Sequence, residues 1–228
     1  MSNVNQPIFT NQLKLHPPRN IIMPIEITNQ EENLTPKSQI QPQSLKALVA
    51  WLTVAGVDIS QWGYGSAKSI ENLWDELACG EMYLQNNPLL RVVPVVQVII
   101  RRGDKLLIEA EQQFADQRKR YRNHPPSEKM KPGENHLDTA IRCLREELGV
   151  EAEDIEFILA SYRQAKKELE SPSYPGLWTS YIFHIIEAKV SGLPDTDFWT
   201  NEADENLRDV VKKHHWIWQD ADDSHIFG

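Results

Sequence analysis

The hydrophobic positions change their spacing along the chain, from a helical period to a strand-like one. Between Ser44 and Gly56 apolar residues recur three and four positions apart, which predicts an amphipathic helix closed by the glycine. The same spacing returns between Ile70 and Leu77. We therefore expect a helical extension over residues 43–90. Because amphipathic helices usually bury one face, packing against the main domain is favoured over a cap that binds a partner or shapes the substrate.

After Pro88 the pattern becomes that of β-strands. The segment RVVPVVQVIIRR is rich in Val and Ile, and Gly103–Asp104 predicts a two-residue turn into KLLIEAEQQF, so the two segments signal a hairpin. A long polar loop is expected over residues 115–133, followed by a helix. Later strands are expected in DIEFILASYRQ, LWTSYIFHIIEAKV and KKHHWIWQDAD. Strands on both sides of a central helix predict a mixed α/β sandwich over residues 91–228.

In the first 42 residues the apolar positions follow neither the helical nor the strand-like spacing. They are rich in Asn, Gln, Pro and Thr, and their apolar residues are scattered. Such a segment buries too little apolar surface to offset the entropy of ordering it. We expect residues 1–42 to form a disordered or loosely docked arm.

Composition and charge narrow the function classes. The chain has 228 residues and a net charge of −9, so no overall attraction to nucleic acid or to anionic membranes is expected. The two cysteines, Cys79 and Cys143, form no CxxC pattern, which argues against a disulfide framework or a structural zinc site. The longest apolar run is too short to span a bilayer, and no signal pattern opens the chain. We predict a cytoplasmic protein that does not contact membranes.

The stretch GENHLDTAIRCLREELGV carries the candidate chemistry. Asn135 and Asp138 form a capping pair, so the helix is predicted to start at about His136. Glu146 and Glu147 then present adjacent carboxylates near the helix C-terminus, where the helix dipole favours cations. A divalent ion that prefers oxygen ligands, Mg²⁺ or Mn²⁺, would relieve this conflict. Taken alone, the two glutamates are better explained as solvated surface charges.

The wider pattern around these glutamates resembles the Nudix box of the Nudix hydrolase superfamily. That box runs Gly, five residues, Glu, seven residues, then Arg-Glu-aliphatic-any-Glu-Glu-any-Gly-aliphatic. Aligned on EELGV, Glu134 stands at the first Glu and Arg142 at the Arg, and Leu144 takes the aliphatic position. The resemblance runs from Glu128 to Val150, about a tenth of the chain. It implies the α/β/α sandwich with a mixed sheet that the family adopts.

The resemblance also implies a reaction and roles for the box residues. Nudix enzymes typically hydrolyse a nucleoside diphosphate linked to another group, with Mg²⁺ neutralising charge on the pyrophosphate. Glu134 and Arg142 would pair and hold the loop against the helix. By this match the catalytic residues would be Glu147, Glu146, Glu134 and Arg142. The metal ligands would be Glu146, Glu147 and Glu128, the last through its backbone carbonyl or its carboxylate.

Two departures from the box bear on activity. Cys143 replaces a Glu, and helical spacing places it beside Glu147, away from the apolar stripe of the helix. A neutral thiol is a poor Mg²⁺ ligand and base, and losing a positioned base costs about a hundredfold to ten-thousandfold in rate. Glu128 replaces a Gly, and a positive φ at that position would cost a Glu about 1 kcal/mol.

The segment before the box carries the densest basic run of this acidic chain. Arg118, Lys119, Arg120 and Arg122 surround Tyr121 in the expected loop. Arg118, Arg120 and Arg122 could grip phosphate while Tyr121 stacks on a base. A solvated run of charges is an equally weighted alternative.

A replacement for the missing base could come from two other acidic pairs. Glu109 and Glu111 lie two apart on a predicted strand, so they would share one face that could look toward the acidic helix. Glu168 and Glu170 fall in a predicted loop. Each of these residues alone is better explained as an ordinary acidic residue. His184 is better explained as a satisfied core histidine than as a ligand.

The sequence thus predicts a Nudix-type hydrolase that cleaves a pyrophosphate bond in a nucleoside diphosphate derivative with Mg²⁺ or Mn²⁺, with activity reduced by Cys143. The alternative is a weak or silent Nudix-fold module that binds a nucleotide or an RNA 5′ end. A protein-binding scaffold has only generic support. A small nucleotide derivative is the expected partner, with an RNA 5′ end and a homodimer left open. Loops outside the box set the substrate, which is not predicted.

Overall fold

The computed structural model describes residues 27–28, 39–65, 67–86, 88–202 and 211–221. Most of the expected N-terminal arm lies outside these described residues. The α-helices of the described part are α1 (Leu45–Val54), α2 (Ile70–Ala78) and α3 (His136–Leu148). None of the described helices is long and apolar enough to cross a membrane.

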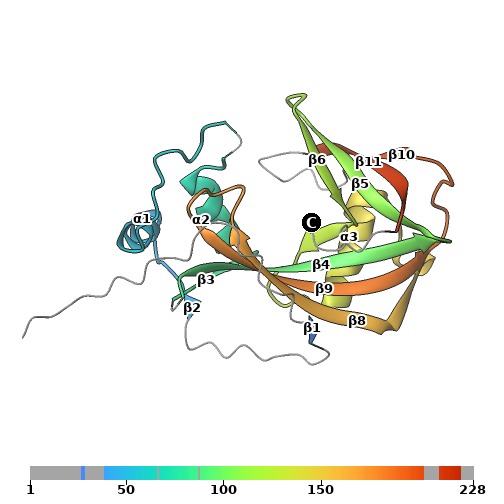
Figure 1. Ribbon diagram of the computed structural model, residues 1–228, viewed down its shortest axis with the longest axis horizontal. Helices are drawn as coiled ribbons and strands as arrows, with labels where there is room; N and C mark the ends of the chain where they lie inside the picture. Colours follow the sequence, from blue (N-terminus) through green and yellow to red (C-terminus); the bar gives the residue numbers. More distant parts are fainter. Residues whose placement is uncertain (1–26, 29–38, 66, 87, 203–210, 222–228) are drawn as a thin grey trace, which may run out of the picture.

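The strands build one mixed sheet. Figure 1 shows α1 and α2 at the left-hand end of the molecule, whereas α3 lies among the strands of the right-hand half. In chain order the strands are β1 (Ile27–Thr28), β2 (Gln39–Ile40), β3 (Tyr83–Gln85), β4 (Leu90–Arg102), β5 (Lys105–Phe114), β6 (Lys119–His124), β7 (Ser127–Lys129), β8 (Ile155–Glu170), β9 (Trp178–Val190), β10 (Phe198–Asn201) and β11 (Val211–Asp220). The order across the sheet is β1-β8-β9-β4-β5-β11-β10.

Strand β4 is the centre of this sheet. It runs parallel to β9, with Val95 opposite Phe183, and antiparallel to β5, with Arg102 opposite Lys105. The turn between β4 and β5 holds Gly103 at φ 58°, a conformation that favours glycine. The predicted hairpin is therefore present, and the mixed α/β architecture confirms the predicted fold class.

The prediction of a long loop over residues 115–133 is wrong, because β6 and β7 lie within this range. Strand β6 pairs with β5, with Tyr121 opposite Glu111, and β7 pairs with β4, with Glu128 opposite Val96. Their charged residues suit a sheet edge, where side chains reach solvent, and hid the strand pattern. Strand β8 is also longer than expected, so Glu168 and Glu170 lie on a strand rather than in a loop.

Two hydrophobic clusters hold the layers together. The first lies under α3 and includes Leu144, Leu148 and Trp216. The same helix buries Cys143, which is 0% exposed, and Arg142, which is 8% exposed. These two residues were expected on the side of α3 away from the core. That expectation is wrong, because the sheet and β7 cover more of the helix than the apolar stripe alone.

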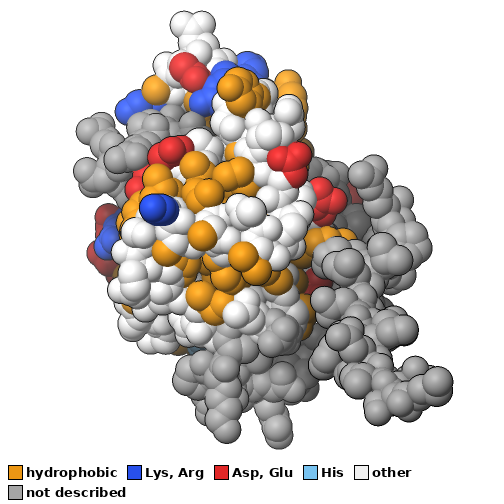
Figure 2. All heavy atoms as spheres, turned by 90° about the vertical axis from the view of Figure 1, so that its left-hand side faces the viewer, with side chains coloured by type: hydrophobic (Ala, Val, Ile, Leu, Met, Phe, Trp, Pro, Cys, Tyr) orange, Lys and Arg blue, Asp and Glu red, His pale blue; other side chains and the backbone are white. Residues whose placement is uncertain are grey.

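The second cluster joins the helical extension to the sheet. Leu73 and Leu77 of α2 belong to the same buried cluster as Val93 and Val95 of β4. Figure 2 views the molecule from the end at which α1 lies and shows hydrophobic side chains gathered near the middle of this face. The extension is therefore packed onto the domain through a shared core.

The extension also touches the loop that precedes α3. Lys129 of β7 pairs with Glu76 of α2 (3.2 Å) and with Glu81 just beyond it (2.7 Å). Gly80 has φ +73°, and a Cβ placed there would lie 2.2 Å from Cγ of Pro132. Only a glycine allows this close approach of the two segments.

We expect Gly80→Ala to lower the free energy of unfolding by about 1–3 kcal/mol more than Gly56→Ala. Both glycines have positive φ, so both substitutions strain the backbone, but nothing lies within 4 Å of a Cβ at Gly56. Denaturant unfolding of the two variants measures the difference. Equal losses of stability would show that the contact between Gly80 and Pro132 contributes nothing.

Candidate active site

Helix α3 begins and ends as its sequence predicts. The Asn135 side chain accepts a hydrogen bond from the Asp138 amide (3.0 Å), and the Asp138 carboxylate accepts one from the Asn135 amide (3.4 Å). At the other end Gly149 has φ 68° and closes the helix. The capping pair and the glycine therefore place Glu146 and Glu147 in the last turn.

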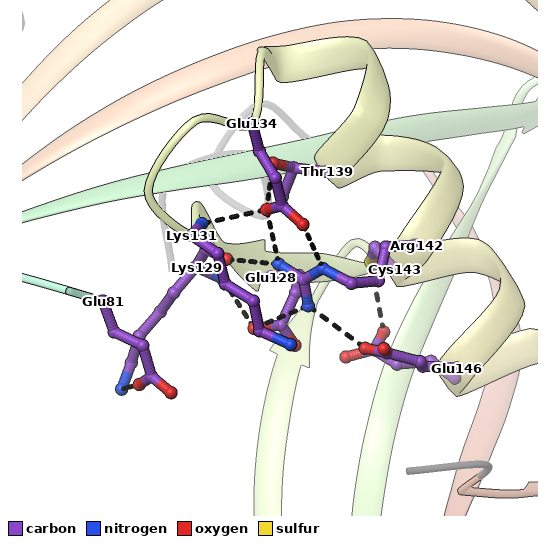
Figure 3. Close-up of polar contacts among 10 residues, drawn as sticks. Glu81, Glu128, Lys129, Lys131, Glu134, Thr139, Arg142, Cys143 and Glu146 are labelled. Atoms are coloured by element: carbon purple, nitrogen blue, oxygen red, sulfur yellow. Dashed lines mark hydrogen bonds and ion pairs between the residues drawn. The ribbon is translucent and has the colours of Figure 1, made fainter. Parts of the chain in front are cut away.

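Arg142 lies at the centre of a network that ties the loop to α3 (Figure 3). Its guanidinium donates to both carboxylate oxygens of Glu134 (2.8 and 3.0 Å), to the Lys129 carbonyl (2.7 Å) and to Glu146 (3.1 Å). Burial alone would raise the pKa of Glu134, but hydrogen bonds from Arg142 and its other neighbours outweigh this effect and lower the pKa to about 2. The expected pair of Glu134 and Arg142 is thus present, and Arg142 also contacts Glu146.

Glu128, which stands where the box has a glycine, is not strained. Within the described residues the non-glycine positions with positive φ are Gln117 and Asn123, so the cost considered for Glu128 does not arise. One Glu128 carboxylate oxygen lies 3.6 Å from Nη1 of Arg142. Burial raises the pKa of Glu128, and Arg142 opposes this shift. A regular strand position is therefore enough to hold a glutamate here.

Glu147 and Cys143 form a buried pair on the inner side of α3. Glu147 is 4% exposed, and the Cys143 thiol donates to Oε2 of Glu147 (3.7 Å). Burial raises the pKa of Glu147, and the neighbouring carboxylates of Glu109 and Glu128 raise it further. Burial also raises the pKa of the Cys143 thiol, and the charge of Glu147 adds to this. Cys143 therefore stays neutral and supplies neither a base nor a metal-binding thiolate.

A histidine that the sequence reasoning missed faces the same region. His214 of β11 is 1% exposed and lies between Glu109 (Nδ1 to Oε1, 2.5 Å) and Glu202 (Nε2 to Oε2, 3.1 Å). Burial would lower the pKa of His214, but hydrogen bonds to both carboxylates outweigh this and raise it to about 10. His214 is therefore a buried cation. Its spacing of two from the buried Trp216 was the signal in the sequence that placed it on the inner face.

The four predicted replacement residues are not brought together. Glu109 contacts His214, whereas Glu111 accepts hydrogen bonds on the other face, one of them from Gln113 (2.9 Å). A register shift between Glu109 and Glu111 separates them, so the expectation of one shared face is wrong. Glu168 pairs with Lys166 (2.8 Å), and Glu170 accepts a hydrogen bond from the Gly176 amide (2.8 Å). Neither of these last two lines the cavity described next.

A cavity of about 780 Å³ connects several of these residues. Glu128 and Glu147 line it from the box, and His214 and Glu202 line it beside them. Arg142, Glu134 and Glu146 are not among its lining residues. The box residues thus divide into a frame around Arg142 and a pair of carboxylates that face the cavity.

Three of the four residues expected to grip phosphate or a base also line the cavity. These are Arg120, Tyr121 and Arg122, which lie on β6 rather than in a loop. Arg120 donates to the Gln112 side chain (2.9 Å) and lies over the ring of Phe114. Arg118 is different, since it precedes β6 and pairs with Asp116 (2.6 Å) outside the cavity.

The carboxylates at the cavity do not form a complete cage for a metal. Within the described ranges no group of three or more His, Cys, Asp or Glu side chains is arranged to hold a metal ion. Mg²⁺ seldom needs such a cage, because it keeps several waters and binds one or two carboxylates together with substrate phosphates. Glu128 and Glu147 both line the cavity, and burial together with the neighbouring carboxylates raises the pKa of Glu147, so the two residues fit this second kind of site.

Comparison with solved structures finds similar chains. An Ap4A hydrolase of C. elegans, solved as a binary complex, shares 13% sequence identity, with a TM-score of 0.33, over 56% of this chain and 79% of that one. A NUDIX hydrolase from Nitrosomonas europaea shares 14% identity, with a TM-score of 0.35, over 59% and 80%. No curated protein sequence matches the chain.

The sequence profile of the NUDIX domain matches residues 91–223. This match covers more than half of the 228 residues and contains the whole box, helix α3 and the strands from β4 to β11 except Leu90, the first residue of β4. Members of this family cleave nucleoside diphosphate derivatives and generally use divalent metal ions. The chain belongs to the Nudix hydrolase family.

Proposed function

We propose that this protein hydrolyses a pyrophosphate bond in a nucleoside diphosphate derivative with Mg²⁺ or Mn²⁺, at a rate reduced by Cys143. One observation carries the proposal. A single cavity is lined by the box carboxylates Glu128 and Glu147 and by the cations Arg120 and Arg122. Carboxylates that can hold a divalent ion and guanidinium groups that can hold phosphate are the two components that pyrophosphate cleavage requires.

Each group has a role that its surroundings support. Glu147 and Glu128 would hold the ion, which would neutralise the pyrophosphate and favour ionisation of a bound water. Arg120 and Arg122 would hold phosphate oxygens, and the exposed ring of Tyr121 offers a stacking surface beside them. The frame of Glu134 and Arg142 would keep the loop and α3 in register. Glu146 serves this frame, because Arg142 already holds its carboxylate.

We expect Arg120→Gln to weaken binding of a nucleoside diphosphate by about tenfold, equivalent to about 1.4 kcal/mol. Arg118→Gln is the matched control, because Arg118 pairs with Asp116 and does not line the cavity. Isothermal titration with the Mg²⁺ complex of ADP measures both affinities. If the two variants lose equal affinity, or none, the cavity cations do not hold the phosphates.

Arg122 is less suitable for this comparison. Its Nε lies 3.2 Å from the buried carboxylate of Glu109, so its removal would also leave that charge less well compensated. The contacts around β6 therefore distinguish Arg120, which donates to the neutral side chain of Gln112, from Arg122, which compensates the buried charge of Glu109.

Thermal unfolding with and without metal tests the proposal against its rivals. We expect Mg²⁺ or Mn²⁺ at millimolar concentration to raise the unfolding temperature of the wild type, and a nucleoside diphosphate to raise it further. Glu147→Gln should remove the effect of the metal. A wild type that neither metal nor nucleotide stabilises would contradict the proposal and leave a scaffold role.

A module that binds without cleaving is the second candidate, and Cys143 favours it. The box position that Cys143 occupies has no carboxylate, and its buried thiol stays neutral. In that case a nucleotide or an RNA 5′ end would bind the same cavity and stay intact. Metal and nucleotide would then stabilise the protein without any product. A homodimer would be visible in the same samples by light scattering.

We also propose a cytoplasmic, reducing setting. The two cysteines are free, and the buried one lies beside a carboxylate rather than beside a second thiol. Intracellular proteins commonly keep their thiols reduced. Secretion of the protein with a mixed disulfide at Cys79 would contradict this setting.

A further inference from the structure

The cavity extends beyond the part of the chain that the family profile matches. That match begins at Arg91, whereas α2 and the residues beside it precede it. Yet Lys68, Asn72, Asp75 and Cys79 line the same cavity as the box carboxylates. The extension therefore adds a wall that the family domain does not itself contain.

This wall is fixed to the domain through buried charge. Glu76 of α2 is 7% exposed and pairs with Arg91 (2.5 Å), Lys68 (3.0 Å) and Lys129 (3.2 Å). Figure 3 shows Lys129 of β7 beside Glu81, next to the frame around Arg142. Removing one member of a buried ionic cluster is costly, so α2 is held at the cavity rather than resting loosely beside it.

The two ends of the cavity differ in charge. At the β6 end Arg120 and Arg122 suit phosphate. At the α2 end Lys68, Asp75 and Glu76 line the cavity, so charges of both signs are present and a second phosphate has no clear advantage there. Mixed donors and acceptors instead suit hydroxyl groups, since each hydroxyl can both donate and accept.

Apolar side chains line the same cavity as these polar groups. Leu169 of β8 and Phe183 of β9 line the cavity together with Val93 and Val95 of β4. A sugar ring offers the matching surfaces, with C–H groups on its faces and hydroxyls at its rim. Pockets of this kind combine an apolar floor with a few placed polar groups.

We propose that α2 forms a subsite for the sugar attached to the diphosphate, so that the substrate is a nucleoside diphosphate sugar. Asp75 accepts hydrogen bonds from the sugar hydroxyls, and the apolar side chains that line the cavity contact the ring. The inference rests on the proposed function, because the phosphates must lie at the β6 end for the sugar to reach α2.

Ligand pairs that differ by one sugar provide the test. The probes are ADP and ADP-ribose, and UDP and UDP-glucose, each as the α,β-methylene analogue so that it cannot be cleaved. Titration calorimetry with Mg²⁺ should show that at least one pair gains about tenfold in affinity from the sugar. Asp75→Ala should reduce this gain to about twofold or less and leave the affinity of the diphosphate unchanged. Glu71→Ala is the control, because Glu71 is an exposed acid of the same helix that does not line the cavity.

The rate at which Cys79 is labelled provides a second measurement, which does not depend on a substitution in the subsite. It is exposed and lines the cavity, whereas Cys143 is buried, so N-ethylmaleimide should label Cys79 selectively. We expect the sugar-bearing analogue to slow this labelling at least about fivefold more than the diphosphate alone at equal occupancy. Cys79→Ser checks that the label is on Cys79.

The outcomes separate the subsite from the proposed function. If diphosphates bind but no sugar adds affinity, or Asp75→Ala and Glu71→Ala keep the same gain, the subsite is wrong and the proposed function stands. Equal protection of Cys79 by the diphosphate and by its sugar-bearing analogue would also overturn the subsite. If no nucleoside diphosphate binds at all, both the subsite and the proposed function fail.

Discussion

Glu147→Gln is expected to abolish turnover while stabilising the metal-free protein. Burial and the neighbouring carboxylates raise the pKa of Glu147 above its ordinary 4.5. The unfolded chain therefore loses this proton at a lower pH than the folded chain, so the free energy of unfolding falls as pH rises from 4.5 toward the raised pKa. Gln has no proton to lose and removes this penalty. We expect the unfolding midpoint without metal at pH 8 to rise by about 2 °C or more.

The loss of activity has a separate cause, because Gln is a weaker metal ligand than a carboxylate. We expect a fall in rate of about a hundredfold or more, measured by release of nucleoside monophosphate. Glu146→Gln is the neighbouring control. Its carboxylate pairs with Arg142 and does not line the cavity, so this variant should lose stability and keep more of its turnover. A Glu147→Gln variant that is less stable at pH 8 and fully active would contradict the assignment.

Cys143→Glu is expected to make the stability of the protein depend on metal and to raise its rate about tenfold, equivalent to about 1.4 kcal/mol. Cys143 is 0% exposed and touches Glu147, so the new carboxylate is buried beside an existing one. Without metal this crowding should lower the free energy of unfolding by about 2 kcal/mol or more. With Mg²⁺ the same carboxylate becomes an additional ligand, so the stabilisation by metal should exceed that of the wild type.

Cys143→Gln is the matched control for size, because Gln adds the same volume without the charge. It should lose stability and gain neither metal binding nor rate. If the wild type already turns over well and Cys143→Glu changes little, a base outside the box serves the reaction. If neither protein binds a divalent ion and neither turns over, the helix has kept its fold and lost its chemistry.

Local signals in the sequence were sufficient for the fold and for the frame of the site. The capping pair of Asn135 and Asp138 predicted the start of α3, and the richness of the segment in Val and Ile predicted β4. The pair of Glu134 and Arg142 followed from the box pattern and is present at 2.8 Å. These features depend on residues near one another in the chain, whose conformational preferences act locally.

The parts that were missed depend on contacts between distant segments. Strand β6 is rich in charged residues, and its pairing with β5 decides its conformation more than its propensity does. The register shift between Glu109 and Glu111 sends these residues to different faces, and no periodic pattern predicts a bulge. His214 reaches Glu109 across 105 positions of sequence. The place of α2 at the cavity likewise follows from the buried pairing of Glu76, which appears only in the folded chain.

The most direct measurement is anion-exchange chromatography of the products that the wild type forms from nucleoside diphosphate derivatives with Mg²⁺ or Mn²⁺. Water attack on a pyrophosphate bond yields a nucleoside monophosphate and the phosphorylated remainder of the substrate. We predict both products from at least one derivative, and neither product with EDTA or with Glu147→Gln. Absence of nucleoside monophosphate above the Glu147→Gln level, for every derivative and with both ions, would contradict the proposed hydrolysis.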